Sequence, residues 1–430
     1  MQSNIKKLYG LFLEYPSIST DSRNIIKGSL FFALKGDNFN GNKYAEDALS
    51  KGASYAIIDE KQYQKDNRFF LVKDVLESLQ ELAKFHRQQL NFPIIAITGT
   101  NGKTTTKELI RQVLSEKYIT KATTGNLNNH IGVPLTLLSF SKELEIGIVE
   151  MGANHRNEIA GLCEITQPNF GLITNIGKAH LEGFGSYEGV IMAKSELYSY
   201  LRNNQGKIFL NEDNELLKEI GQDISHISYG SSKKSNIRGE LAKPFPYISI
   251  DYFENKKALR INSNLVGTYN FENMMAAICI GKYFNVDSDQ IKKALESYHP
   301  KNQRSQFLKT KSNEVIIDAY NANPTSMKAA IESFAQSPMT EKTLILGDML
   351  ELGKDSLKEH KNIIGLIKGQ FKSVFLVGEQ FCIAAKDSGI PCFKSTNKLL
   401  KHLNDHPLTK TSILLKASRG IRIENVLDQI

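Results

Sequence analysis

The sequence contains no apolar run that approaches the roughly 18 residues of a membrane-spanning helix. Its first residues, Met1 to Lys7, lack the apolar segment that a secretory signal peptide requires. Both absences predict a cytoplasmic protein without a membrane span.

Cysteine is scarce, with four residues in a chain of 430. They form no Cys-x-x-Cys pair, and each lies among apolar neighbours: Cys163, Cys279, Cys382 and Cys392. Proteins of reducing compartments rarely carry disulfides, whereas small secreted domains depend on them. We therefore expect all four cysteines to be reduced, buried thiols.

The chain has no run of five or more basic residues, so its net charge of +8 is dispersed. A positive balance favours anionic partners, either nucleic acid or phosphorylated small molecules. Because the charge is not gathered into a patch, we expect no nucleic-acid partner. The chain also lacks Gly-x-Gly-x-x-Gly, which excludes a standard dinucleotide site, and it lacks Asn-Lys-x-Asp and Asp-x-x-Gly, which a GTPase switch would carry.

The most informative stretch runs from Ile94 to Thr106. An apolar β-branched run enters a glycine turn, Gly-Lys-Thr-Thr follows, and a helical pattern begins. This arrangement places backbone N–H groups, a lysine and a threonine hydroxyl around a nucleotide phosphate with its Mg²⁺. The spacing is a variant, because Ile97 stands where a standard phosphate loop has its first glycine.

Two further apolar runs end in chemically useful side chains. One run ends at Glu150, and His180 follows the other within a few residues. Ligands of open α/β sheets bind at the carboxyl ends of the strands, so both side chains should meet Lys103 and Thr104 at one rim. A carboxylate and a hydroxyl suit Mg²⁺, although histidine is a less usual ligand for so hard an ion. Taken singly, Glu150 also fits a solvated or salt-bridged residue, and His180 fits an ordinary loop histidine.

Three other polar residues lie on predicted helices or where one begins. Lys194 lies in the helical segment 190–201, where composition alone favours an ordinary solvated lysine. Asn270 and Asn273 stand three residues apart where the apolar helix 274–284 begins. That spacing suits helix capping as well as hydrogen bonding to a ligand, and both interpretations stay open.

The pattern of strands and helices predicts an α/β protein of three domains, with borders at residues 1–85, 86–299 and 300–430. The first is a small α/β unit, and the amphipathic segment 75–90 is a helix that bridges into the second. The second opens with the phosphate loop and ends in short strands over 225–265, with a surface hairpin at 231–234. In the third, strands and helices alternate as in a doubly wound domain. Asp318 and Asp348 end two of its strands and are candidates for ligand contact.

Taken together, the segment 98–105 with Glu150, His180, Lys194 and Asp318 resembles the Mur ligases of peptidoglycan synthesis over nearly the whole chain. The segments 124–136, 318–327 and 347–353 also carry the resemblance to this family. The Asp-Asn-Pro-Arg motif of the sister ligase that adds the third peptide residue is absent. Within the family, the chain resembles the member that adds D-alanyl-D-alanine, and the absence of that motif supports this resemblance. It implies a central P-loop mononucleotide-binding domain and a Rossmann-like C-terminal domain.

The resemblance also implies a role for each matching residue. Glu150, His180 and Thr104 would bind Mg²⁺ with Lys194, which the family carbamylates; because a carbamate forms only on a neutral amine, the pKa of Lys194 should be depressed. ATP would be held by Gly99, Thr100, Asn101, Gly102, Lys103, Thr104, Thr105, Asn270, Asn273, Arg304, Asp318, Asn321 and Asn323. The substrates would contact Ser22, Arg23, Asn126, Asn128, Asn129, Lys416, Ser418 and Arg419.

The implied activity is ATP-dependent formation of an amide bond. ATP would phosphorylate the terminal carboxylate of UDP-N-acetylmuramoyl-tripeptide, and the amine of D-alanyl-D-alanine would attack the acyl phosphate. The partners are then small molecules, and a monomer is expected. The alternatives are another Mur-type ligase, a ligase like folylpolyglutamate synthase, or a GTPase switch.

Overall fold

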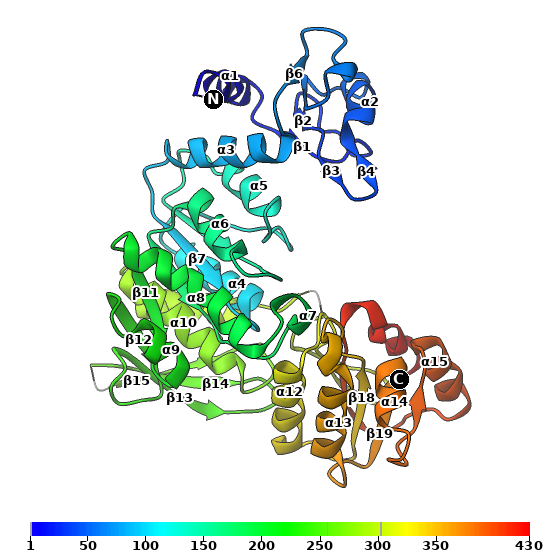
Figure 1. Ribbon diagram of the computed structural model, residues 1–430. Helices are drawn as coiled ribbons and strands as arrows, with labels where there is room; N and C mark the ends of the chain where they lie inside the picture. The colour runs from blue at the N-terminus through cyan, green and yellow to red at the C-terminus, as the bar shows by residue number, and fades with distance from the viewer. Residues whose placement is uncertain (1, 256, 302) are drawn as a thin grey trace.

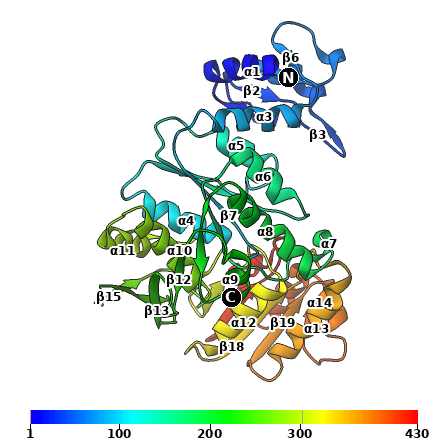
Figure 2. The same ribbon diagram turned by 60° about the vertical axis from the view of Figure 1, so that its left-hand side comes forward.

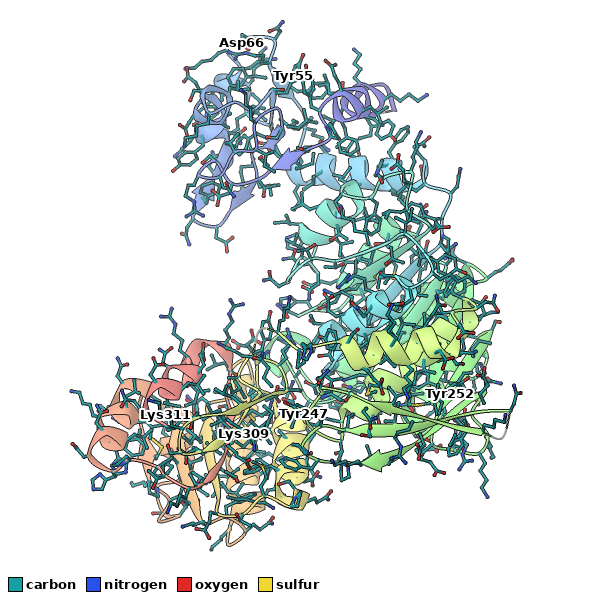
Figure 3. The ribbon with its side chains drawn as sticks, turned by 180° about the vertical axis from the view of Figure 1, so that it is seen from behind. Tyr55, Asp66, Tyr247, Tyr252, Lys309 and Lys311 are labelled. Atoms are coloured by element: carbon teal, nitrogen blue, oxygen red, sulfur yellow. A yellow bond between two sulfur atoms is a disulfide. The ribbon has the colours of Figure 1, made fainter. Side chains whose placement is uncertain are left out.

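The computed structural model describes residues 2–255, 257–301 and 303–430. Its strands form three separate main sheets that follow one another along the chain, each with its own helices. The N-terminal and C-terminal sheets lie at opposite ends of the molecule, with the central sheet between them (Figures 1 and 2). Seen from behind, Tyr55 and Asp66 lie at one end, and Lys309 and Lys311 lie at the other (Figure 3). The predicted class, α/β with three domains, is confirmed; the borders of the domains stay a prediction.

The N-terminal domain is built on a four-stranded parallel sheet in the order β1-β2-β5-β6. Its middle strands are fully or almost fully buried, as parallel strands covered on both faces must be. The elements are α1 (Gln2–Glu14), β1 (Ile18–Ser19), β2 (Leu30–Phe32), β3 (Lys35–Gly36), β4 (Phe39–Asn40), η1 (Gly41–Tyr44), α2 (Ala45–Ser50), β5 (Tyr55–Ile58), η2 (Lys61–Tyr63) and β6 (Phe69–Leu71).

Helix α3 (Val75–Arg87) joins this domain to the next and confirms the predicted bridging helix. Asp74 begins the helix by accepting a hydrogen bond from the Glu77 N–H. The helix packs against α1 on one side and against α5 and α6 of the central domain on the other. At its last turn the buried Arg87 donates to the carbonyl oxygens of Thr166 and Gln167. The junction is therefore held by both packing and hydrogen bonds.

The central domain has a nine-stranded sheet in the order β15-β14-β13-β12-β11-β10-β7-β9-β8. Strands β7, β9 and β10 are parallel neighbours, so their carboxyl ends open on the same edge. The elements are β7 (Ile94–Thr98), α4 (Lys103–Leu114), β8 (Thr120–Ala122), α5 (Gly132–Leu138), β9 (Ile146–Glu150), α6 (Glu158–Thr166), β10 (Phe170–Ile173), α7 (Leu181–Phe184), α8 (Tyr187–Asn203), β11 (Lys207–Asn211), α9 (Glu215–Gly221), β12 (His226–Gly230), β13 (Ile237–Lys243), β14 (Ser249–Glu254), β15 (Lys257–Asn262), α10 (Asn270–Tyr283) and α11 (Ser288–Ser297).

The short strands predicted over 225–265 are present, but the predicted hairpin at 231–234 is wrong. Strands β12 and β13 run parallel, and the segment between them is a looped connection rather than a hairpin turn. The Asp213 carboxylate holds this loop by accepting hydrogen bonds from the N–H groups of Ser231 and Ser232. A polar loop alone does not reveal the direction of the strand that follows it. The antiparallel hairpins lie further on, between β13, β14 and β15.

The C-terminal domain is a six-stranded sheet in the order β16-β17-β21-β18-β19-β20, parallel except for the edge strand β16. The elements are β16 (Gln306–Lys309), β17 (Glu314–Ile317), α12 (Pro324–Gln336), β18 (Lys342–Gly347), η3 (Gly353–Asp355), α13 (Ser356–Ile367), β19 (Ser373–Val377), α14 (Glu379–Ala384), β20 (Cys392–Phe393), α15 (Thr396–Asp405), β21 (Ser412–Lys416), η4 (Arg419–Ile421) and η5 (Ile423–Gln429).

The cysteine prediction holds for one pair and is wrong for the other. Cys163 and Cys279 are buried free thiols, and burial raises the pKa of both. Cys382 and Cys392 instead form a disulfide, with Cα atoms 5.4 Å apart. Cys382 lies on α14 and Cys392 on β20, and the packing of these elements brings the thiols together without any Cys-x-x-Cys spacing.

Among the described residues, no helix is both long and apolar enough to cross a membrane.

Candidate active site

The phosphate loop connects β7 to α4, as the sequence predicts. Gly102 takes a left-handed conformation, with φ of 78°, and α4 begins at the next residue. A Cβ atom at Gly102 would stand 2.6 Å from the Asn273 Oδ1 atom, so only glycine fits. The N–H groups of the first turn of a helix have no carbonyl partner within the helix, and this leaves them to bind an anion.

Neighbouring strands hold the loop in shape. The Asn175 side chain, just after β10, accepts a hydrogen bond from the Asn101 N–H and donates one to the Asn101 carbonyl oxygen. The Thr174 hydroxyl donates to the same oxygen over 2.6 Å. Within the loop, Lys103 Nζ donates to the carbonyl oxygens of Gly99 and Thr100. Burial, together with repulsion from Arg304, lowers the pKa of Lys103.

Glu150 ends β9 beside the loop, since it pairs with Ile97 in the sheet. It is 2% exposed, which excludes the solvated alternative. Its Oε1 atom accepts hydrogen bonds from the Thr104 hydroxyl and the Asn128 amide. Its Oε2 atom is buried and has no hydrogen-bond partner among the described residues. The nearest positive charge is the fully buried Lys107, whose Nζ lies 3.7 Å away.

His180 precedes α7, and its Nδ1 atom lies 2.6 Å from the Glu351 carboxylate of the C-terminal domain. The histidine bond holds the pKa of Glu351 below its usual range. His180 lines the same cavity as Thr104 and Glu150. The structure therefore brings together three of the four predicted metal ligands.

Lys194, the fourth predicted ligand, lies on α8 and is 2% exposed, so it is no solvated surface lysine. Its Nζ atom lies 3.5 Å from the Ala153 carbonyl oxygen and faces the Phe184 ring. Burial and the charge of Lys103 lower the pKa of Lys194 to about 7. A large share of this amine is therefore neutral near pH 7, which is the form that carbamylation needs.

These residues fit a magnesium ion by the chemistry of their donors. A buried carboxylate oxygen is costly unless it is hydrogen-bonded or paired with a cation. Glu150 Oε2 has no hydrogen-bond partner among the described residues, and Lys107, 3.7 Å away, is its ion-pair partner. The Thr104 hydroxyl and the Glu150 carboxylate are oxygen donors of the kind that Mg²⁺ prefers. Among the described residues, no three His, Cys, Asp or Glu side chains form a metal site by themselves. A metal site here would therefore need further donors, and the roles of Thr104 and of a modified Lys194 in it stay predictions.

Asn270 and Asn273 line the cavity, but their amides are engaged within the protein. Asn273 donates to Asn270 Oδ1 and accepts from the Thr106 hydroxyl of α4. Asn270 donates to the Val266 carbonyl oxygen and to the Ser305 hydroxyl. Neither side chain caps α10. Both thus support the loop and the domain junction, and contact with adenine stays a prediction.

Arg304 and Asp318 reach the cavity from the C-terminal side. The guanidinium of Arg304 stacks on the Tyr320 ring at 3.4 Å, and the Arg419 guanidinium lies on the same ring at 5.5 Å. Arg304 Nε is buried without a hydrogen-bond partner among the described residues. The Asp318 carboxylate accepts from Lys416 Nζ over 2.6 Å. Asp318 and Lys416 are thus paired with each other, whereas the guanidinium groups of Arg304 and Arg419 lie on one ring and can receive an anion.

Two cavities meet at this junction. One, of about 490 Å³, is lined by the phosphate loop, Glu150, His180, Asp318, Asn321 and Asn323. Asn323 donates to the Asn101 side chain across the junction over 2.8 Å. The other, of about 750 Å³, shares Thr104, Thr105, Asn126, Arg304 and Tyr320 with the first and extends to Arg111, Lys301 and Arg419. Two adjoining spaces around one phosphate site suit a reaction between a nucleotide and a second substrate.

Comparison with known proteins places all three domains in one family. Residues 14–87 match the model "Mur ligase family, catalytic domain", residues 97–281 "Mur ligase middle domain", and residues 303–418 "Mur ligase, glutamate ligase domain". The chain belongs to the Mur ligase family.

Individual Mur ligases match over almost the whole chain. The UDP-N-acetylmuramoyl-tripeptide–D-alanyl-D-alanine ligase of Bacillus subtilis is 33% identical, with 96% of this chain and 92% of the relative covered. A crystal structure of MurF from Acinetobacter baumannii matches with a TM-score of 0.85 at 30% identity, over 96% of this chain and 92% of that one. MurF ligase from Thermotoga maritima in complex with ADP matches with a TM-score of 0.86 at 27% identity, over 97% of each chain.

The residues assigned to the Mur ligase substrates are spread more widely than the ATP residues. Ser22 and Arg23 lie in the N-terminal domain and line neither of the two cavities. Asn126 lines both cavities. The Asn128 amide donates to Glu150, and Asn129 accepts from the Gly132 N–H at the start of α5.

The predicted carboxylate-binding set at the C-terminus is only partly available. Lys416 is buried and paired with Asp318. The buried Ser418 hydroxyl accepts from the Leu350 N–H. Arg419 is exposed and lines the larger cavity. The geometry thus leaves Arg419 as the member of this set that can meet a substrate, and its role stays a prediction.

Sequence reasoning missed four residues: Lys107, Asn175, Tyr320 and Glu351. Each lies inside or next to a stretch that the sequence singles out, so the signal was their position in a motif. Asp348, which was a candidate for ligand contact, is instead buried, and it accepts hydrogen bonds from the N–H groups of Gln380 and Phe381. It therefore fixes the start of α14.

Proposed function

We propose that this Mur ligase joins D-alanyl-D-alanine to UDP-N-acetylmuramoyl-tripeptide in the cytoplasm, with conversion of ATP to ADP and phosphate. Relatives whose names state this activity match over almost their whole length. The observation that carries most weight is that one cavity is lined by Lys103 of the central domain and by Arg304 and Asp318 of the C-terminal domain. The two cations, Lys103 and Arg304, thus come from two domains to a site where phosphoryl transfer needs positive charge.

The reaction needs an activated carboxylate, since a free carboxylate is a poor electrophile. Its oxygen takes the γ-phosphoryl group from ATP, which leaves ADP and an acyl phosphate. The amine of D-alanyl-D-alanine then attacks the acyl carbon, loses a proton, and the tetrahedral intermediate expels phosphate. Negative charge builds up on the transferring oxygens, so preorganised cations and N–H groups stabilise the transition state.

The phosphate loop and Arg304 would each bind part of the phosphate chain in this reaction. The free N–H groups at the start of α4 would bind the phosphates, and Lys103, held by two loop carbonyl oxygens, would meet the outer one. Arg304, fixed on the Tyr320 ring, would neutralise the transferring group from the opposite side. Because the two cations come from different domains, docking of the C-terminal domain completes the charge of the site.

Thr104, Glu150, His180 and the carbamate of Lys194 would hold Mg²⁺. When bound, the ion would offset the negative charge of the phosphoryl group during transfer. The carbamate would convert a buried cation into an anion close to Lys103, whose charge already lowers the pKa of the Lys194 amine.

The decisive experiment measures phosphate release from ATP with UDP-linked tripeptide, with and without D-alanyl-D-alanine. We expect release that requires both substrates, together with a pentapeptide product identified by mass. Tripeptides ending in diaminopimelate and in lysine are tested in parallel. Absence of release with both would overturn the assignment and direct the search to folate and glutamate substrates.

Lys103→Ala is expected to abolish turnover, with a loss of at least about 100-fold, because Lys103 is the side chain of the phosphate loop that we propose meets the outer phosphate. Phosphate release under saturating substrates is the measurement. Lys398→Ala, which removes an exposed lysine of α15, is the control and should match the wild type. A Lys103→Ala enzyme near the wild-type rate would refute the phosphate-loop assignment.

A further inference from the structure

The motif Gly347–Gly353 of the C-terminal domain reaches across to the central domain beside α7. There the Glu351 carboxylate lies 2.6 Å from His180 Nδ1, and the Glu351 carbonyl oxygen accepts from the Glu182 N–H over 3.4 Å. Figure 1 shows α7 next to the C-terminal domain, on the same side as α12 and α13. Glu351 of the C-terminal domain thus contacts His180 of the central domain, and His180 belongs to the proposed metal site.

The surrounding backbone fixes Glu351 in place. Asp348 is tied to the start of α14, and the Leu350 N–H donates to the Ser418 hydroxyl. Glu351 itself has φ of 65°, and His180 has φ of 50°. Left-handed residues other than glycine persist only where the structure around them holds them, and they gather at functional sites. The contact therefore joins two constrained backbones rather than two mobile loops.

The choice of nitrogen atom has a chemical consequence. A histidine that donates from Nδ1 to a carboxylate keeps Nε2 as the nitrogen that can bind a metal, and this pairing fixes the orientation of the ring. We propose that Glu351 is a positioning residue that orients His180 for the metal and makes the complete metal site depend on docking of the C-terminal domain. The inference rests on the proposed function, because it needs the metal site assigned there.

Binding of Mn²⁺ to the full-length protein with ADP tests the proposal without measuring turnover. Electron paramagnetic resonance follows the loss of the free-ion signal. Glu351→Ala should weaken Mn²⁺ binding by about 10-fold or more, as loss of a carboxylate behind a histidine ligand does. Glu351→Gln should recover most of the affinity, because its amide oxygen still accepts from Nδ1. Glu332→Ala, which removes an exposed carboxylate that lies 3.8 Å from Lys328 on its own helix, should match the wild type.

His180→Ala separates this proposal from the one it rests on. It should weaken Mn²⁺ binding at least as much as Glu351→Ala, and the double variant should lose no more than His180→Ala alone. Wild-type affinity in Glu351→Ala with impaired His180→Ala would overturn the role of Glu351 and leave the metal site intact. Wild-type affinity in both variants would overturn the metal assignment itself. Equal losses in Glu332→Ala and Glu351→Ala would show a nonspecific charge effect and also refute the proposal.

Discussion

Asn273 shapes the phosphate loop through its side-chain amide. Its Oδ1 atom accepts from the Thr106 hydroxyl and occupies the space in which a side chain at Gly102 would lie. Capping and ligand binding were the two alternatives for this asparagine, and the structure shows a third use. Its network makes the left-handed turn at Gly102 a fixed feature rather than a flexible one.

Gly102→Ala should weaken ATP binding by on the order of 10-fold, since a left-handed alanine costs roughly 1–2 kcal/mol and its methyl group would displace Asn273. Calorimetric titration with a non-hydrolysable ATP analogue is the measurement. Gly161→Ala is the matched control, because a Cβ atom there would meet nothing within 4 Å. Equal affinities in the two variants would show that the loop tolerates the methyl group.

The carbamate on Lys194 should depend on pH. Burial lowers the pKa of Lys194 from 10.5 to about 7, so the neutral amine predominates above pH 7 and is lost as pH falls below it. The carbon-13 signal of a carbamate, formed from labelled bicarbonate, should therefore grow between pH 6 and pH 8. Lys194→Ala should lack the signal and lose activity, and short carboxylic acids should partly restore that activity. A signal absent throughout this range would contradict the carbamate.

Helix α12 begins at the junction of two domains, and its capping residue serves both. The Asn323 side chain accepts a hydrogen bond from the Ser326 N–H, and the Ser326 hydroxyl accepts one from the Asn323 N–H. The same asparagine donates to Asn101 of the phosphate loop. The start of a helix in one domain is thereby linked to the nucleotide loop of another.

Asn323→Ala should cost about 1 kcal/mol at the start of α12, which speeds amide hydrogen exchange there about fivefold, and it should weaken ATP binding. Asp287→Ala removes the equivalent cap of α11, outside the lining of both cavities. We expect this control to show the same local loss with unchanged ATP affinity. Unchanged affinity in Asn323→Ala would mean that the contact with Asn101 does not support the loop.

Local sequence patterns predicted the elements whose signals are local. The phosphate loop is encoded by consecutive residues, and the parallel strands β7 and β9 carry Lys103 and Glu150 to one edge by a general rule of α/β sheets. The Glu351–His180 contact and the Cys382–Cys392 disulfide are different in kind. They depend on how finished elements pack, and neither a spacing nor a composition records that. The parallel direction of β13 was missed for the same reason.

The central and C-terminal domains are docked through polar contacts as well as packing. Lys178 Nζ lies 2.7 Å from the Glu359 carboxylate, which is nearly buried, and the Lys178 N–H donates to the Thr325 hydroxyl. The Thr268 N–H donates to the Ser333 hydroxyl of α12. The degree of closure, which the sequence does not give, follows from such pairs.

Lys178→Ala should loosen this docking, because among the described residues it leaves the buried Glu359 carboxylate with the Asn362 amide as its one remaining donor. An uncompensated buried group costs roughly 1–3 kcal/mol. Small-angle X-ray scattering should therefore give a larger radius of gyration for Lys178→Ala than for the wild type. Lys328→Ala removes a lysine that pairs within α12 and should leave the radius unchanged. Identical scattering from all three proteins would show that the ion pair is dispensable.

The cavity with walls from two domains also changes how the protein melts. A ligand that binds only when both walls are present adds its binding free energy to the docked state, about 2.7 kcal/mol at a concentration 100 times its dissociation constant. Without nucleotide, we expect the central and C-terminal domains to unfold as separate calorimetric units. With nucleotide, we expect the two transitions to merge into one, because unfolding of either domain would release the ligand. ATP would thus make the unfolding of these two domains cooperative, in addition to driving the reaction.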